Sequence, residues 1–138
     1  MVLMFFNISN HPSSKWSEKQ REAAFALGRY IEDIPFPHVP PTASEREVEE
    51  LAYDLLIPLM RREWREDEDD VYMIQGEFSL TYLMTRLVLS TGRKVVVACT
   101  ERKVQESTLE GGKVEKTSTF EFVRFRLVFD PSYFHRGY

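Results

Sequence analysis

A polar loop near the start of the chain holds side chains that suit an anionic or aromatic ligand. Hydroxyl and amide groups placed just before a helix can bind a phosphate together with backbone N–H groups and the helix dipole. Lys15 would add a positive charge, Trp16 a stacking surface for a base, and His11 a donor or an acid and base. The ligand-binding candidates in this loop are Asn7, Ser9, Asn10, His11, Ser13, Ser14, Lys15 and Trp16.

A second polar loop lies further along the chain, between Gln75 and Thr81. Gly76 permits close backbone approach to a ligand, and Glu77 is an acidic group placed to act as a general base or to accept from a ribose hydroxyl. The ligand-binding candidates here are Gln75, Gly76, Glu77, Phe78, Ser79 and Thr81. Thr100 and Arg102 complete the rim, with Arg102 suited to a phosphate through its guanidinium. The catalytic candidates of the whole chain are His11 and Glu77.

Both loops also have a purely structural interpretation. Ser, Asn and Pro are ordinary turn residues, and Ser17 would simply cap a helix. Trp16 would then pack on that helix, while Glu77 and Ser79 would cap the helix that follows the second loop. The sequence leaves both interpretations open.

Four apolar segments predict the strands that would position these loops. Val2–Ile8 is almost continuously apolar, as expected of a strand buried on both faces of a parallel sheet. The other predicted strands are Tyr30–Ile34, Val71–Ile74 and Lys94–Cys99.

Three helices are predicted between these strands. Ser17 with Gln20 forms a capping box that opens a helix ending at Gly28. Ser44 with Glu47 forms a second box, before an apolar stripe of Val48, Leu51, Ala52, Leu55, Leu56 and Leu59 that Pro58 should kink or restart. The third helix has the stripe Leu80, Leu83, Met84, Leu87 and Val88, and Gly92 ends it.

This alternation predicts an α/β fold with a mostly parallel sheet and right-handed crossovers. In such sheets, ligands bind outside the carboxyl ends of the strands, where the two polar loops would meet. In the tail, Lys103–Thr108 and Lys113–Phe129 flank a turn at Leu109–Gly112, which predicts an antiparallel hairpin on the sheet edge. Strict alternation in its second strand would place Val123, Phe125, Leu127 and Phe129 on one face, opposite Phe120, Phe122, Arg124 and Arg126.

Length and composition limit the function classes. A chain of 138 residues predicts a single domain, 1–138. The net charge of −4 disfavours binding to duplex nucleic acid, and no apolar run reaches the roughly 20 residues needed to span a membrane. Met1–Ile8 lacks the basic start of a signal peptide, and the single cysteine, Cys99, suits a reducing compartment, so we expect a cytoplasmic protein.

The sequence lacks the motifs of several enzyme classes. It has no GxGxxG after a strand, no Walker loop and no CxxC, HExxH or GxSxG. His11, His38 and His135 lie far apart without metal-ligand spacing. We therefore expect neither a cofactor nor a metal.

Three segments together resemble a known family. They are Phe5-Phe6-Asn7-Ile8-Ser9-Asn10-His11-Pro12-Ser13 followed by Trp16, then Asp33-Ile34-Pro35-Phe36-Pro37, and Gln75-Gly76-Glu77-Phe78-Ser79. This pattern resembles the small standalone CRISPR-associated accessory proteins of type III systems, which are built on a Rossmann-like domain of the CARF type. The likeness extends to about Cys99, and the hairpin tail is compatible with it.

The resemblance implies a ligand, an assembly and a role. The ligand would be a cyclic oligoadenylate second messenger, in the first place cyclic tetra-adenylate, held in a pocket shared by two protomers of a homodimer or higher homo-oligomer. The protein would dampen signalling by sequestration, by slow metal-independent ring cleavage, or by both. Cleavage would proceed by attack of a ribose 2′-OH on the adjacent phosphate, as in ring nucleases. The alternatives are a protein-interaction subunit without a nucleotide ligand and an enzyme acting on a mononucleotide or nucleoside.

Overall fold

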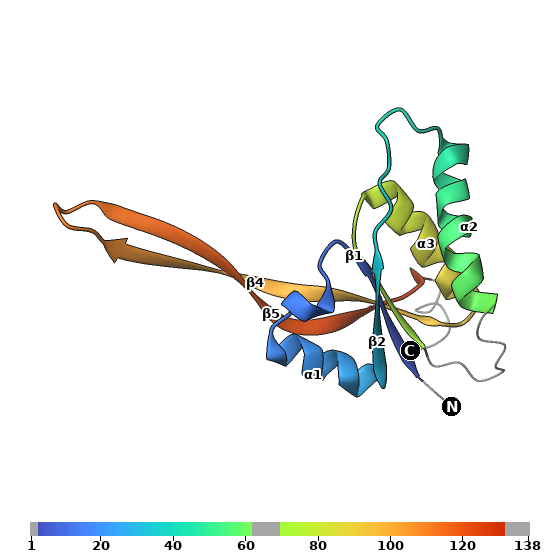
Figure 1. The fold of residues 1–138 in the computed structure, drawn as a ribbon, viewed down its shortest axis with the longest axis horizontal. Helices are drawn as coiled ribbons and strands as arrows, with labels where there is room; N and C mark the ends of the chain where they lie inside the picture. Colours follow the sequence, from blue (N-terminus) through green and yellow to red (C-terminus); the bar gives the residue numbers. More distant parts are fainter. Residues whose placement is uncertain (1–2, 62–69, 132–138) are drawn as a thin grey trace.

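The protein is a five-stranded sheet with helices on both faces (Figure 1). The structure, a computed structural model, describes residues 3–61 and 70–131. The strands are β1 (Met4–Ser9), β2 (Tyr30–Pro35), β3 (Val71–Ile74), β4 (Lys94–Thr108) and β5 (Val114–Val128). The helices are α1 (Glu18–Leu27), α2 (Glu45–Arg61) and α3 (Phe78–Ser90), with a short 3₁₀ turn, η1, at Ser13–Lys15.

The strand order in the sheet is β2-β1-β3-β4-β5. The first four strands pair in parallel and β5 pairs antiparallel with β4. This confirms the predicted α/β class, the mostly parallel sheet and the C-terminal hairpin. The chain leaves β1 toward β2 on one side and returns to β3 on the other, so the boundary between β1 and β3 is the topological switch point of the sheet.

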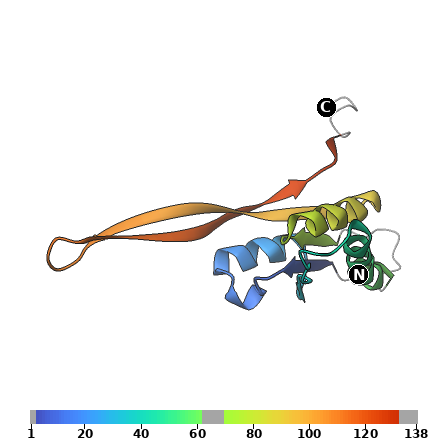
Figure 2. The ribbon, with the colours of Figure 1, turned by 90° about the horizontal axis from the view of Figure 1, so that it is seen from above.

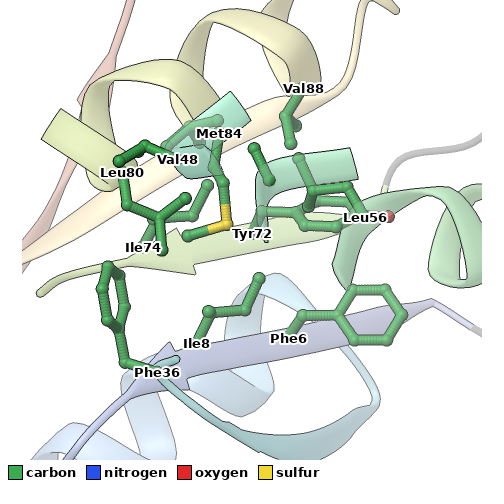
Figure 3. Packing of buried hydrophobic residues seen from close by; sticks show 12 residues of the cluster. Phe6, Ile8, Phe36, Val48, Leu56, Tyr72, Ile74, Leu80, Met84 and Val88 are labelled. Atoms are coloured by element: carbon green, nitrogen blue, oxygen red, sulfur yellow. The ribbon is translucent and has the colours of Figure 1, made fainter. Parts of the chain in front are cut away.

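Each face of the sheet has its own core. On one face, α2 and α3 pack over Phe6, Ile8, Tyr72 and Ile74 (Figure 3). On the other face, α1 and Trp16 cover Phe5, Val71 and Met73 of the same two strands. They also cover Phe122 and Phe125 of β5. Because both faces are covered, β1 and β3 read as nearly continuous apolar runs in the sequence.

The predicted helix caps are present. Ser17 Oγ accepts from the backbone N–H of Gln20 at 3.2 Å. Ser44 and Glu47 exchange side-chain-to-backbone bonds of 3.2 and 3.3 Å at the start of α2. The helix α2 continues through Pro58 to Arg61 without a restart, although this proline has no N–H to donate to the carbonyl of Asp54.

The predicted hairpin is present, but its first strand is not separate from the predicted strand Lys94–Cys99. The strand β4 does not end at Cys99 but continues to Thr108, paired with β5. We call Glu101–Glu121, the part of the hairpin that extends beyond the other three strands, the arm. Every residue of the arm is exposed. Figures 1 and 2 show the arm extending far from the helices. Gly111 and Gly112 close its tip at φ of 90° and 78°, values that favour glycine.

The predicted alternation of side chains along β5 is wrong at one point. Cys99 pairs with Arg124, whereas Thr100 pairs with Phe122, so Val123 is inserted as a bulge. The extra residue shifts the alternation, and Phe122 and Phe125 therefore both face α1, with ring centroids 4.9 Å apart. Phe122 had been placed on the face opposite Phe125.

Within residues 3–61 and 70–131, no helix combines the length and apolar character needed to cross a membrane.

Candidate ligand-binding site

A cavity of about 610 Å³ opens at the carboxyl edge of the sheet, on the face that carries α1. Its walls come from the loops after β1 and β3, from α1, and from the strands where the arm begins. The lining residues are Ser9, Asn10, His11, Trp16, Gln20, Met73, Gln75, Gly76, Ala98, Thr100 and Phe120. The two polar loops singled out in the sequence thus meet at the β1/β3 switch point.

The cavity brings together some of the predicted site residues and not others. Those that line it are Ser9, Asn10, His11, Trp16, Gln75, Gly76 and Thr100. Those that do not are Asn7, Ser13, Ser14, Lys15, Glu77, Phe78, Ser79, Thr81 and Arg102. Four lining residues were missed: Gln20, Met73, Ala98 and Phe120. The alternation of side chains along β3 and β4 could have indicated Met73 and Ala98. Predicting Phe120 would have required the position of the bulge and the full pairing register of the arm.

The backbone of His11 is fixed by hydrogen bonds at both its carbonyl oxygen and its N–H group. The carbonyl oxygen accepts from Asn7 Nδ2 at 2.8 Å and from Trp16 Nε1 at 3.1 Å, and the N–H donates to Ser9 Oγ at 3.2 Å, whose hydroxyl in turn donates to Asn7 Oδ1 at 2.6 Å. Asn7 is 1% exposed and Trp16 is 7% exposed, so both donors to the carbonyl are part of the core. The exposed side chain of His11 is thereby held at the wall of the cavity.

Asp33, at the end of β2, holds the other side of the same loop. Its Oδ1 accepts from Asn7 Nδ2 at 2.8 Å and from the backbone N–H of Ser13 at 3.0 Å, and its Oδ2 accepts from Ser13 Oγ at 2.9 Å. Asn7 and Ser13 therefore shape the loop rather than the cavity wall. Sequence analysis did not propose Asp33 as a site residue, although it lies in the Asp33–Pro37 segment of the resemblance.

A smaller cavity of about 220 Å³ lies on the β2 side of this loop. It shares Ser9 and Asn10 with the larger cavity, so the loop after β1 forms a partition between the two. The lining residues are Asn7, Ser9, Asn10, Pro12, Asp33, Ile34 and Pro35.

The loop after β3 is anchored at Gln75 and Gly76. Gln75 Oε1 accepts from the backbone N–H of Ala98 at 2.8 Å, which orients the side-chain amide against β4. Gly76 lies against the ring of Phe36, and a Cβ added there would come within 2.4 Å of Phe36 Cδ2. The absence of a side chain at this position therefore allows the loop to sit on the segment that follows β2.

Glu77 caps α3. Its carboxylate accepts from the backbone N–H groups of Ser79 and Leu80, both at 2.9 Å, and from Ser79 Oγ at 2.7 Å. The hydrogen bond from the Ser79 hydroxyl, followed by those from the two backbone N–H groups, lowers the pKa of Glu77. This is the structural interpretation of Glu77 and Ser79 that the sequence left open, and it keeps the carboxylate ionised and aimed at the helix.

Trp16 packs in the core and also lines the cavity. Its ring packs edge-on against Phe5 at 6.0 Å between centroids and lies 6.1 Å from the ring of Phe125. Arg102, by contrast, lies on the arm, where its guanidinium donates to Ser118 Oγ at 3.0 Å.

The cavity wall combines amide, hydroxyl and imidazole groups with apolar surface from Trp16, Met73 and Phe120. Its lining contains no lysine and no arginine among the residues the structure describes. Within the same part of the chain, no group of three or more His, Cys, Asp or Glu residues could hold a metal ion. The wall therefore suits a ligand bound by hydrogen bonds and stacking.

The model of the uncharacterized protein MJ1673 family matches residues 3–126 of the chain. The matched segment includes all five strands apart from the last two residues of β5, and it includes every residue that lines the cavity. Neither the curated proteins nor the solved structures gave a match to the chain.

Proposed function

The chain belongs to the uncharacterized protein MJ1673 family, and we propose that it binds a cyclic oligoadenylate, in the first place cyclic tetra-adenylate, and dampens type III CRISPR signalling. The observation that carries this proposal is the cavity at the β1/β3 switch point, built from the two loops on which the resemblance rests. In open α/β sheets, ligands bind at such a switch point, outside the carboxyl ends of the strands.

The chemistry of the wall supports an adenylate ligand. Gln75, Asn10 and Gln20 offer amide donors and acceptors of the kind that read base edges and ribose hydroxyls. Phe120 and Trp16 offer apolar ring surface at the same cavity, and base–aromatic stacking contributes about 1–3 kcal/mol per base.

The size of the cavity supports a ligand shared between two protomers. Its volume of about 610 Å³ is within the range of single small-molecule sites, about 300–1,000 Å³. A ring of four nucleotides is larger than one such ligand, so one protomer would hold part of the ring. A two-fold symmetric dimer would then present the same groups twice to a symmetric ligand.

The geometry favours holding the ring over cutting it. Of the two catalytic candidates, Glu77 is engaged at the start of α3, and His11 is the titratable side chain at the cavity wall. In any cleavage, a ribose 2′-oxygen would attack the adjacent phosphorus and the bond from phosphorus to the 5′-oxygen of the next nucleotide would break, leaving a 2′,3′-cyclic phosphate and a 5′-hydroxyl. His11 would take the proton from the 2′-OH or give one to the leaving 5′-oxygen. We therefore propose sequestration as the main activity, with slow metal-independent cleavage resting on His11.

Calorimetric titration with cyclic tetra-adenylate and with cyclic hexa-adenylate tests binding. We expect heat with at least one ring, a stoichiometry of one ring per two chains, and weaker binding by His11→Ala. The matched control is His38→Ala, which removes an exposed imidazole that does not line the cavity. Absence of heat with both rings would refute the proposal.

Incubation of a labelled ring with the protein in EDTA separates capture from cleavage. A linear product that accumulates beyond the amount of protein would indicate turnover, and His11→Ala should abolish it. Unchanged turnover in both His11→Ala and Glu77→Ala would remove both acid–base candidates. Intact ring at stoichiometric protein would leave sequestration alone.

The volume of the cavity also favours a second candidate, an enzyme or binder specific for a mononucleotide or nucleoside. A thermal-shift screen with AMP, adenosine and the two rings separates the candidates. A larger stabilisation by AMP or adenosine than by either ring would favour the second one.

A further inference from the structure

The side chain of Gln75 continues the hydrogen bonding of the sheet at the wall of the cavity. The pairing of β3 with β4 ends at Met73 and Val96. Two residues further along β4, the backbone N–H of Ala98 has no partner on the backbone of β3, and Gln75 Oε1 accepts from it at 2.8 Å. A buried N–H without an acceptor is costly, so this contact keeps the side-chain amide of Gln75 in place.

This hydrogen bond decides which end of the amide is left for the cavity. An N–H group needs an acceptor, so the oxygen of the amide must face Ala98, and the amide cannot turn over without losing the bond. Gln75 is partly buried and lines the cavity. Within residues 3–61 and 70–131, its Nε2 has no hydrogen-bond acceptor. Nε2 is therefore a donor that is held in a fixed orientation and remains free for a ligand.

The surroundings of this donor are apolar. Met73, two positions before Gln75, is 2% exposed and belongs to the core on the α1 face of the sheet, and Ala98 packs against the same core. Trp16 and Phe120 add ring surface to the cavity lining. A hydrogen bond is stronger in such surroundings than in water, and a polar group that stays unpaired there costs more. The donor should therefore discriminate strongly between ligand groups that accept a hydrogen bond and groups that do not.

The rest of the lining indicates which ligand group meets the donor. A phosphate inside the cavity would lose its hydration and find neither lysine nor arginine among the described residues that form the lining, and a buried charge without a partner is costly. A base is neutral and flat, which suits the ring surface of Trp16 and Phe120. The ring nitrogens N1, N3 and N7 of adenine accept hydrogen bonds. A base therefore fits the wall around Gln75 better than a phosphate does.

We propose that Gln75 determines which part of a ligand enters the cavity: its Nε2 donates to a ring nitrogen of an adenine base, and the phosphates stay outside the lining. A ring shared by two chains fits this arrangement, because each chain would take bases of the same ring while the phosphates remain at the cavity mouths. The identity of the base rests on the proposed function, whereas the fixed orientation of the donor does not.

Gln75→Glu separates the structural role of this side chain from its role toward a ligand. The carboxylate keeps an oxygen acceptor for the N–H of Ala98, so the midpoint of urea unfolding should not fall, but it replaces the donor by a second acceptor. Calorimetry at about pH 8, where a glutamate is ionised, should show binding of cyclic tetra-adenylate weakened by at least about tenfold. The control is Gln105→Glu, the same change at an exposed position of the arm, which should leave binding unchanged. Unchanged binding by Gln75→Glu would overturn the proposal.

Modified rings test whether the donor meets a base. Rings built from 1-deaza-, 3-deaza- or 7-deaza-adenosine each replace one ring nitrogen by C–H. We expect one of the three to bind the parent chain at least about tenfold more weakly than the normal ring, and the other two within about threefold.

The same modified ring should lose this disadvantage with Gln75→Glu, because the missing acceptor then has no donor to meet. Gln20→Glu puts the same charge into the same lining, and whatever it does to affinity, the loss caused by the modified ring should remain. A loss that persists with Gln75→Glu, or no loss with any of the three rings, would overturn the proposal and assign Nε2 to a phosphate or a ribose.

A thermal-shift series with AMP, adenosine and their three deaza analogues distinguishes a failure of this inference from a failure of the proposed function. If the parent chain binds neither ring but is stabilised by AMP or adenosine, and one analogue loses the effect only while Gln75 is present, the proposed function fails and the inference stands. If the rings bind and Gln75→Glu binds them equally well, the inference fails and the proposed function stands. No stabilisation by any adenine compound would overturn both.

Discussion

The centre of the sheet and the arm are both β structure, but their side chains meet opposite environments. In β1, Phe5–Ser9 are all buried, and in β3 all four residues are buried. In the arm, every residue from Glu101 to Glu121 is exposed. The central strands are held by two covered faces, whereas the arm is held by its ladder of hydrogen bonds.

This difference separates two contributions to the molecule. Buried strands supply the stability of the fold, and segments with few buried contacts open at low cost and supply interactions. The cavity lies at the border between the two regions, with Met73 and Ser9 from the central strands and Phe120 from the arm. A substitution in either region should therefore affect the cavity. In the central strands it would act through the stability of the fold, and in the arm through the cavity wall itself.

The same substitution in the two regions gives the largest expected contrast. Phe5→Ala removes a fully buried ring that contacts Trp16 and Phe125, and should lower the free energy of unfolding by about 3–5 kcal/mol. Phe120→Ala removes an exposed ring and should change it by about 0.5 kcal/mol or less. Urea unfolding at low protein concentration measures both. Similar losses would mean that the arm is packed against the body.

Gly76→Ala tests how closely the loop after β3 is fitted to the body. The added Cβ would meet the ring of Phe36, which must move, and we expect a loss of about 1–3 kcal/mol in the free energy of unfolding. Phe36→Leu makes room at that point, so the double variant should lose less than the sum of the two single changes. Strict additivity in the urea midpoints would show that the contact is not the cause.

Asp33→Ala should have a smaller effect, concentrated in the loop after β1. The change removes the acceptor for Asn7 Nδ2 and Ser13, which should cost about 1–2 kcal/mol and loosen the backbone around His11. Hydrogen exchange of the Ser13 amide is the direct measurement. Asp54→Ala, at an exposed position of α2, is the control and should leave that exchange rate unchanged.

The smallest effect concerns the pKa of Glu77. Ser79→Ala removes the leading cause of its lowering, so the pKa of Glu77 should rise toward its ordinary value. In the parent chain, the lowered pKa contributes stability above the unfolded pKa, and this contribution is lost as the pH falls through the folded pKa. Carboxyl chemical shifts followed by NMR across the acidic range measure the change, and an unmoved titration would contradict the assigned cause.

The sequence predicted the body of the fold and the C-terminal hairpin, but not how the two are joined. The central strands are apolar on both faces and the capping boxes are local signals, so Val71–Ile74 and the start of α2 were placed correctly. The end of β4 at Cys99 was wrong because a polar, exposed ribbon carries no burial signal. The bulge at Val123 was missed because it depends on the register between two strands.

The site was predicted in position and only partly in detail. The two loops meet as the strand order requires, but their polar residues divide between those that line the cavity and those that support the loop. Asn7 and Asn10 have the same side chain, and only their surroundings separate them, because Asn7 is held by His11 and by the distant Asp33. Glu77 was separable in principle, because capping of the next helix is a local signal that the sequence already offered.

The hydrogen bonds that hold the backbone of His11 have a consequence for kinetics. A loop already held in one conformation loses little conformational entropy when a ligand arrives, so this cost of binding is largely met during folding. Association with the loop after β1 should therefore need no slow rearrangement, and its rate should depend on access through the mouth of the cavity. Release, rather than capture, would then set how long a bound molecule stays.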